Sequence, residues 1–522
     1  MNTFIRKYAD VVTGTLSGFD RLMLRGTLRQ IAYADGLGRF LGANRILLKE
    51  FGQFAETASA RLKEASLARA EALGRPVQYL ASPGVRKDVL AREIAARDGI
   101  TDGLICVFSA VEPCRSFVIQ PNRELKRIQL VAKKRKCLFL YHYLMHPKFG
   151  FMHVRLQTWL PYEVQVWING REWLSRQLDK HGIEYVRRSN TFPWIADVDR
   201  AQRLAHAQLR TAWPRQLDEL VAEVHPAHAE IFGGWPPIYY WTAYQTEWAT
   251  DIMFRSPDTL AEIYPRLVRH GIAQFGSKDV MRFLGKRLTS TGSIPANFAG
   301  EVVSDLRARP EGIRIKHALG WNSVKLYDKE GSVLRVETTI NRPQDFKVFR
   351  PTQGAEEGPW TWRPMRQGIA DLHRRAKVSQ ASNDRYLAAL AAIETETPLG
   401  CLTARLALPV IHEARRYRAL NPSAPDDIAL LAAVNRGEFA IAGFRNADLR
   451  GILFPDATED RAETKRRSAR VTRLLRLLRA HGLVMKVQKT HRYTLTAEGR
   501  RAIAAILAAR DVAVEQLIKS AA

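Results

Sequence analysis

The spacing of apolar residues changes along this chain, and that change limits the folds it can adopt. Residues 39–74 and 82–98 carry apolar side chains every three or four positions, which is the period of a helix. Between residues 104 and 168 the period falls to two, in short segments rich in β-branched and aromatic residues that are separated by turns such as 147–150. This pattern predicts an α+β fold, in which helices pack on mostly antiparallel sheets.

Further along, helical spacing returns over residues 171–287, which include an aromatic-rich stretch at 239–248, and a second β region covers 313–348. Residues 351–364 are rich in Pro, Gly and Glu and predict a linker. At 522 residues the chain is too long for one hydrophobic core. The expected parts are an α+β domain with a basic antiparallel sheet (1–190), a helical and β-hairpin region (191–350), a linker with a helical connector (351–420) and a C-terminal module (421–522).

The charge of the chain is strongly unbalanced. Lys and Arg number 80 against 53 Asp and Glu, which gives a formal net charge of +27. A polyanion relieves the self-repulsion of such a surface, so the expected partner is nucleic acid, DNA first and RNA as the alternative, although a basic balance also suits a membrane surface. The sequence has no apolar run of about 18 residues and no signal-peptide core, so we expect a cytoplasmic protein without a membrane partner. Its four scattered cysteines indicate reduced thiols, and nothing in the sequence fixes the oligomeric state.

The last hundred residues alternate helical and strand patterns. The long helical pattern ends in His481-Gly482, which is a carboxyl-cap signal. The expected order is a helix (426–436), a second helix (446–453), a long helix (459–480), a hairpin (483–495) and a final helix from about residue 496.

The long helix is apolar on one side and basic on the other. Its core side is expected to contain Val471, Leu474, Leu475 and Leu478. The basic side chains can then contact phosphates or guanine in the major groove, and they are Lys465, Arg466, Arg467, Arg470 and Arg473, with Lys489 and His491 at the hairpin tip. The stretch 474–484, with 492–496 and Gly499, resembles winged-helix proteins of bacterial regulators and mobile elements. The resemblance implies a winged-helix domain that binds DNA, and the alternative is a solvated charged helix.

Residues 141–157 predict a β-hairpin that is rich in histidine. Strand alternation puts His142 and His146 on one face, and pairing His146 with Phe151 places Arg155 opposite His142. That face would also carry His153 and Gln157, a cluster able to bind a phosphate, hold a metal or move a proton near neutral pH, with His142 as a catalytic candidate. A basic run just upstream is expected to bind nucleic acid: Lys133, Lys134, Arg135 and Lys136. The alternative is a polar sheet face open to water.

A second hairpin is predicted at 323–339. A three-residue loop ending at Gly331 keeps its apolar residues together on one face. The other face then carries two neighbouring pairs, Lys325 with Arg335 and Ser323 with Glu337. The two cations suit a bound phosphate that Glu337 helps to orient, and the alternative is a structural salt bridge.

The string Lys-x-Tyr-Asp-Lys at 325–329, followed by Leu-Arg-Val-Glu at 334–337, resembles a hairpin of rolling-circle replication initiators of plasmids and phages. The resemblance implies that Glu337 helps to hold a divalent metal such as Mg²⁺ and that a tyrosine attacks DNA, for which Tyr386 is the candidate. The chain lacks the His-hydrophobic-His pair that many of those enzymes use. Further carboxylates that could complete a two-metal nuclease site are Asp20, Glu112, Glu247, Asp251, Glu301 and Asp305.

Two functions follow from these patterns. The first hypothesis is a DNA-processing protein of a bacterial mobile element, acting as a nuclease, strand-transferase or replication initiator. The second is a non-enzymatic binder, either a DNA-binding regulator or a protein that binds structured RNA, which interleaved aromatic and basic residues favour. The sequence contains neither a P-loop nor a G-x-S-x-G motif, which argues against a P-loop ATPase and a serine hydrolase.

Overall fold

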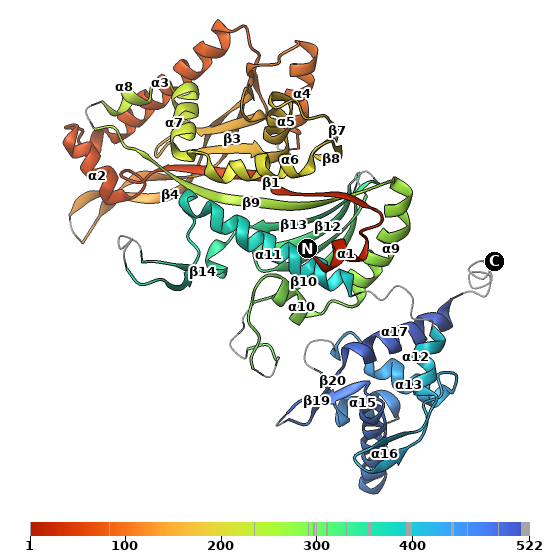
Figure 1. Cartoon of the computed structure of the whole chain (residues 1–522). Coiled ribbons are helices and arrows are strands. Elements are labelled where there is room, and N and C mark those ends of the chain that lie inside the picture. The colour runs from red at the N-terminus through yellow and green to blue at the C-terminus, as the bar shows by residue number, and fades with distance from the viewer. Residues whose placement is uncertain are drawn as a thin grey trace. The chain divides into compact units, whose positions relative to one another are not determined.

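The computed structural model divides the chain into two compact units (Figure 1). The first unit contains Met1–Pro265 and Met281–Ala389, and the second contains Arg266–Val280 and Leu390–Ala522. The described residues are 2–512 except for 83, 125, 234, 291, 296, 297, 299, 310, 311, 330, 353–357, 393–398, 440–442, 457 and 489. Within these residues, none of the helices combines the length and the apolar character needed to cross a lipid bilayer.

Eleven strands of the described chain form one sheet in the first unit. Their order is β10-β11-β12-β13-β9-β1-β6-β5-β4-β3-β2, and every pair is antiparallel except β2 with β3. The mostly antiparallel sheet that the sequence predicts is therefore confirmed. The strands are β1 (Val12–Leu28), β2 (Val77–Tyr79), β3 (Gly103–Asn122), β4 (Arg127–His146), β5 (Gly150–Gln157), β6 (Val164–Asn169), β9 (Tyr239–Phe254), β10 (Val302–Arg309), β11 (Gly312–Leu319), β12 (Asn322–Lys329) and β13 (Val333–Ile340).

The long strands β1 and β9 lie side by side at the centre of the sheet, as Figure 1 shows. They pair from Val12 with Phe254 to Leu28 with Tyr239. The prediction of a helical region around 239–248 was wrong, because this stretch is part of β9. Its aromatic and threonine side chains favour the pleated, half-buried surface of a strand.

Helices pack on this sheet. The apolar core lies between the sheet and several of them, and it includes Leu22 of β1, Val154 of β5 and Leu62 of α3. The helices are α1 (Thr3–Lys7), α2 (Ala34–Ala43), α3 (Phe51–Ala72), α4 (Lys87–Arg97), α5 (Gly170–Lys180), α6 (Val198–Ala207), α7 (Trp213–Val224), α8 (His228–Phe232), α9 (Pro257–Ala273), α10 (Ser277–Phe283) and α11 (Leu372–Ala391), with the unit boundaries falling inside α9, inside α10 and near the end of α11. Cys106, Cys114 and Cys137 are free thiols, as expected.

Helix α11 is fixed to the sheet by buried polar side chains. Trp248 of β9 donates from Nε1 to Gln380 Oε1 at 2.8 Å, and Thr338 of β13 donates to Asn383 Oδ1 at 2.7 Å. Part of the predicted linker is also ordered, because β15 (Thr361–Pro364) pairs with β14 (Lys347–Arg350), whereas residues 353–357 lie outside the described chain. A further hairpin joins β7 (Tyr185–Arg188) to β8 (Thr191–Ile195).

The second unit has its own apolar core. Val471, Leu475 and Leu478 of the long helix are buried in it, as the helical spacing predicts. Its elements are α12 (Leu399–Leu406), β16 (Val410–His412), β17 (Arg415–Tyr417), α13 (Pro425–Val434), β18 (Phe444–Arg445), α15 (Asn446–Leu453), α16 (Arg461–Ala480), β19 (Val484–Lys486), β20 (Arg492–Leu495) and α17 (Ala497–Asp511). Three of these strands form a small antiparallel sheet in the order β18-β20-β19.

Candidate functional site

Charged side chains gather on one face of the sheet where β9, β13 and β12 are neighbours. Strand β13 is buried along its whole length, yet Arg335 and Glu337 are charged and face the same side, two residues apart. Lys325 of β12 is paired directly with Glu337. On β9, Asp251 is paired with Arg335, and Glu247 lies four residues away on the same face.

A β-bulge in β1 adds a fourth carboxylate to this face. Phe19 pairs with Trp248 and Arg21 pairs with Glu247, so Asp20 is an extra residue between them. A bulge redirects side chains, and here Asp20 contacts Arg335 while Arg21 contacts Glu247. The start of α5 lies against the bulge, since a Cβ on Gly170 would be 1.8 Å from the carbonyl oxygen of Phe19.

Arg335 occupies the centre of the buried part of this network. Its Nε and Nη2 atoms donate to the two carboxylate oxygens of Asp251 at 2.6 and 2.8 Å, and its Nη1 donates to Asp20 at 2.9 Å. Arg171 of α5 reaches the same Asp251 at 2.8 Å, and the Asn190 carbonyl accepts from Arg335 at 2.7 Å. Burial alone would raise the pKa of Asp20, but Arg335 and Arg171 hold it below its ordinary value, so this carboxylate stays ionised.

Two glutamates share one lysine beside that centre. Lys325 Nζ donates to Glu337 at 2.7 Å and to Glu247 at 3.0 Å. Burial would lower the pKa of Lys325, but Glu337 and Glu247 raise it, so the ammonium group stays charged. Burial and the nearby Glu247 carboxylate raise the pKa of Glu337, an effect that Lys325 only partly offsets. A second positive charge beside Glu337 would therefore be favourable.

The network fits a divalent cation. Carboxylate oxygens of Asp20, Glu247 and Glu337 lie within 4.8 Å of one another, and carboxylate oxygens are the ligands that Mg²⁺ prefers. The network contains four buried carboxylates against three buried cations: Asp20, Glu247, Asp251 and Glu337 against Arg171, Lys325 and Arg335. A bound cation would have to share Glu247 and Glu337 with Lys325.

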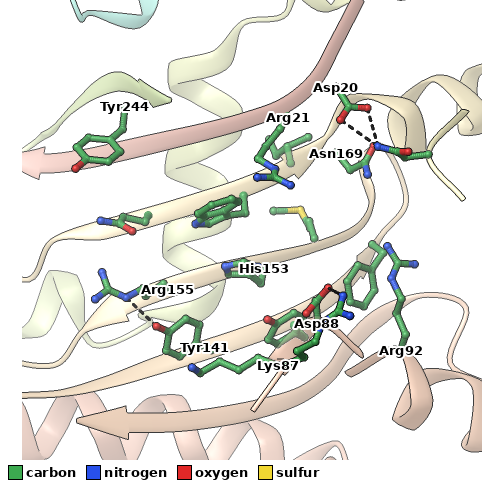
Figure 2. Close-up of a pocket in the computed structure, with 18 of the residues that line it drawn as sticks. Asp20, Arg21, Lys87, Asp88, Arg92, Tyr141, His153, Arg155, Asn169 and Tyr244 are labelled. Carbon is green, nitrogen blue, oxygen red and sulfur yellow. Dashed lines mark hydrogen bonds and ion pairs between the residues drawn. The ribbon is translucent and has the colours of Figure 1, made fainter. Parts of the chain in front are cut away.

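An open pocket of about 710 Å³ borders this network. Its floor is the sheet, and Figure 2 shows Asp20 and Arg21 on one side, His153 near the centre and Arg155 beside Tyr141. Lys87, Asp88 and Arg92, which belong to α4, lie along the opposite side. The pocket therefore meets the buried network at Asp20, and the rest of its lining is rich in cations and aromatic rings.

Aromatic rings form a row across the floor of the pocket. Tyr143 of β4, His153 of β5 and Trp167 of β6 are neighbours in the pairing register. The ring centroids of Tyr143 and His153 are 4.9 Å apart, and those of His153 and Trp167 are 5.6 Å apart and nearly parallel. The Arg21 guanidinium lies 5.4 Å above the Trp167 ring.

Cations outnumber anions in the lining of the pocket, with Arg21, Arg86, Lys87, Arg92 and Arg155 against Asp20, Asp88 and Glu112. Burial, followed by the charges of Arg155, Lys87 and Arg21, lowers the pKa of His153 to about 3. The negative charge of Glu112 is compensated inside the pocket, because Arg155 Nη2 donates to its carboxylate at 2.5 Å and the Tyr141 hydroxyl donates to it as well. An anionic ligand would meet an excess of positive charge here.

The register predicted for the histidine hairpin was wrong. His146 pairs with Gly150 rather than with Phe151, so His142 lies opposite Val154. The reason is a three-residue turn at 147–149: Gly150, which follows it, has a φ of 69°, and His146 Nδ1 accepts from the backbone of Lys148 at 3.0 Å. A shift of one residue reverses the faces, and His153 and Arg155 therefore lie in the pocket while His142 is 2% exposed in the core.

The second hairpin keeps its predicted faces but not its predicted neighbours. Its loop lies one residue further on, since Lys329 pairs with Val333 across residues 330–332 and Gly331 has a φ of 79°. Lys325 is therefore opposite Glu337, not Arg335. The polar face is buried rather than open to water, which makes these pairs part of the network described above.

The remaining predicted residues of the first unit lie elsewhere. Tyr386 is fully buried, and its hydroxyl meets His317 Nε2 at 3.1 Å. Of the predicted acidic set, Asp305 pairs with Arg314 on β11, and neither it nor Glu301 joins the carboxylate group at Glu337. The four basic residues 133–136 are exposed on β4, with Arg135 lying 5.4 Å above the Trp159 ring.

The basic residues of the second unit lie on and beside α16. Arg466 is 77% exposed and pairs with Glu463, whereas Arg467 is 19% exposed and pairs with the same glutamate. Arg470 reaches Asp426 at 3.3 Å. Lys465 lines a hollow of about 510 Å³ with residues of α15 and α16, Arg473 and His491 are exposed, and Lys489 lies outside the described residues.

Arg21 and Arg25 form part of this site, but the sequence did not single them out as functional residues. A signal was present: within 12–28, arginines stand four residues apart at positions that alternate with buried leucines. The chain matches no family of known proteins, no curated protein and no solved structure. Function must therefore be inferred from the site, because fold alone does not determine it.

Proposed function

We propose that this protein binds DNA through its second unit and processes a DNA strand at the polar face of its first unit. The observation that supports DNA binding is the order of elements α13, β18, α15, α16, β19 and β20, together with the strand order β18-β20-β19. Three helices followed by a hairpin are the arrangement of a winged helix, in which the third helix enters the major groove.

The third helix of this arrangement is α16. Val471 and Leu475 attach it to the core, which leaves Lys465, Arg466 and Arg473 directed away from the core. Phosphate contacts make binding depend on salt, with a slope of about 0.9 per contact on duplex DNA.

The test of DNA binding is the affinity of the full chain for duplex DNA over a range of salt concentrations. Replacing Arg466, Arg470 and Arg473 by Ala should weaken binding and reduce the slope by about one unit per lost contact. An unchanged slope would contradict a role for α16. A matched control removes the same charge elsewhere: Arg97, Arg203 and Arg215, all exposed in the first unit.

The observation that favours strand processing is the carboxylate group of Asp20, Glu247 and Glu337 beside a positively charged pocket. A divalent cation held there would polarise a phosphate and favour ionisation of a bound water. Arg21, whose side chain is 46% exposed and 3.6 Å from Glu247, would hold the phosphate at the entrance. Lys325 and Arg335 orient the carboxylates. Tyr386 is excluded from this proposal, because its burial keeps its hydroxyl from DNA.

The assay is cleavage of supercoiled and single-stranded DNA with Mg²⁺ or Mn²⁺ and with a chelator. Cleavage that requires the metal supports a nuclease or strand-transferase. Its absence on both DNA and RNA would contradict the processing role and favour the second candidate, a non-enzymatic regulator or RNA-binding protein. The close pairing of Arg335 with Asp251 favours that second candidate, since paired charges also serve structure alone.

A further inference from the structure

Three arginines follow one another along the exposed face of β1 and just beyond its end. Arg21, Arg25 and Arg29 are spaced four residues apart, and the residues between them alternate with buried leucines. Because successive strand residues face opposite sides, the first two share a face. At about 3.3 Å per residue, neighbouring arginines of this series are about 13 Å apart along the strand.

Each of these arginines lies over an aromatic ring. The guanidinium carbon is 5.4 Å from the centroid of Trp167 for Arg21, 4.7 Å from that of Tyr244 for Arg25, and 4.6 Å from that of Tyr240 for Arg29. Two of the rings are exposed, since Tyr244 is 43% exposed and Tyr240 is 40% exposed, and Trp167 is partly buried.

We propose that these three arginine–aromatic pairs form a track for an unpaired nucleic-acid strand that leads into the pocket. Bases would stack on the rings of Trp167, Tyr244 and Tyr240, and the arginines would pair with the phosphates between them. Stacking on aromatic rings and a row of cations are the two features by which proteins hold single strands without reading their sequence. This proposal rests on the proposed processing function and names the form of its substrate.

The track ends where the chemistry is proposed. The same Arg21 guanidinium that lies over Trp167 is 3.6 Å from Glu247, so a phosphate held by Arg21 would lie beside the carboxylate group. Arg155 and Lys87, which together with burial and Arg21 lower the pKa of His153, line the pocket between β1 and α4. Arg25 also reaches Glu163 at 2.8 Å in a partly exposed ion pair, in which a phosphate could take the place of the Glu163 carboxylate.

The test measures binding of the full chain to labelled oligonucleotides of about 15 thymidines or 15 uridines, by fluorescence anisotropy without added metal. Replacing Arg21, Arg25 and Arg29 by Ala should weaken binding and reduce the salt slope by about two units, because each phosphate contact on a single strand contributes about 0.7. Trp167→Leu, Tyr244→Leu and Tyr240→Leu should each weaken binding at least about fivefold, given the measured strength of base stacking.

Two controls separate this proposal from duplex binding. Trp321→Leu removes a ring that is 68% exposed outside the track, and the Arg97, Arg203 and Arg215 variant removes three charges elsewhere; neither should alter oligonucleotide binding beyond a small change. The variant in which Arg466, Arg470 and Arg473 are replaced by Ala should bind duplex DNA more weakly and should bind the oligonucleotides with unchanged affinity. The track would be overturned if its variants bound the oligonucleotides with wild-type affinity, or if only the α16 variant failed to bind them. Neither result would contradict the proposal that α16 binds duplex DNA. A preference for thymidines would identify DNA as the source of the strand and a preference for uridines would identify RNA, whereas equal binding would show that the track accepts either strand.

Discussion

Arg335 and Asp251 form a two-point ion pair in which both side chains are completely buried. Removing one partner of such a pair leaves the other charge without compensation in a region from which water is excluded. The pair joins β13 to β9, and through Asp20 the same guanidinium reaches β1. Three strands that are distant in sequence are thereby connected through one side chain.

Arg335→Ala should lower the free energy of unfolding by about 3–5 kcal/mol, because Asp251 and Asp20 would lose their shared cation. Arg171 would still contact Asp251, so the loss is expected at the lower end of that range. Urea denaturation followed by circular dichroism measures it. Arg473→Ala, at an exposed position, is the control and should change stability by less than about 0.5 kcal/mol. Equal stability of the two variants would mean that the buried pair contributes little.

Glu337→Gln should reduce metal-dependent cleavage of DNA about a hundredfold or more, since one essential electrostatic group commonly contributes some 2.7–4 kcal/mol. The amide has nearly the same shape and can still accept from Lys325, which also remains paired with Glu247. Duplex binding should persist, because α16 lies in the other unit. The matched control is Glu112→Gln, a carboxylate of the pocket outside the metal-fitting group. Full activity of Glu337→Gln would place the active centre elsewhere.

His142 should make the protein less stable in mild acid. Burial lowers its pKa from 6.5 to about 4 in the folded chain. The folded state therefore resists protonation that the unfolded chain accepts, so the contribution of His142 to stability is complete above about pH 6.5 and is lost as the pH falls toward 4. The difference in pKa corresponds to about 3 kcal/mol.

His142→Phe keeps a ring of similar size and removes the titrating group. Unfolding free energies measured between pH 7 and pH 4 should fall less steeply for this variant than for the wild type. His153→Phe is a poor comparison, because it also alters the pocket. Parallel pH dependence in the wild type and His142→Phe would show that other groups account for the loss.

The C-terminal fragment should be more stable when it begins before residue 421. Leu406 of α12 and Leu420 are buried in the same core as Leu431 and Leu478. A fragment of residues 399–512 retains both, whereas one of residues 421–512 exposes the apolar surface that they cover. Each buried leucine contributes about 1.5–3 kcal/mol, so the longer fragment should melt at least about 4 °C higher by circular dichroism. Equal melting temperatures would support the boundary expected at 421.

Elements with one apolar face were predictable from the sequence, as α16 and α15 illustrate. Their apolar side chains recur at three and four residues because one side packs on a core. Strand β9 was not predictable in this way, since both of its faces are covered from Thr246 to Phe254 and the period of two is lost there. The prediction of the hairpin register was wrong because one residue more or less in the turn before Gly150 decides whether His142 lies in the core or in the pocket.

The candidate site could be predicted only in part. Glu337, Lys325 and Arg335 are close in sequence, and a hairpin brings them together on one face. Asp20, Glu247 and Asp251 were possible members of the site among several acidic residues. They are selected only because β9 pairs with β1 on one side and with β13 on the other. Gly170 approaches Phe19 closely beside the bulge at Asp20, a contact between distant segments that no local pattern reveals.

The pairing of β1 with β9 also has a consequence for synthesis on the ribosome. Val12 finds its partner at Phe254, so the first strand of the sheet leaves the ribosome long before its neighbour exists. At about 5–20 residues per second, β1 would wait on the order of 10–50 seconds with one hydrogen-bonding edge unpaired. Strand edges of this kind are where nascent chains associate with one another. Charged side chains on an unpaired strand oppose such association, and β1 carries two of them, Arg21 and Arg25.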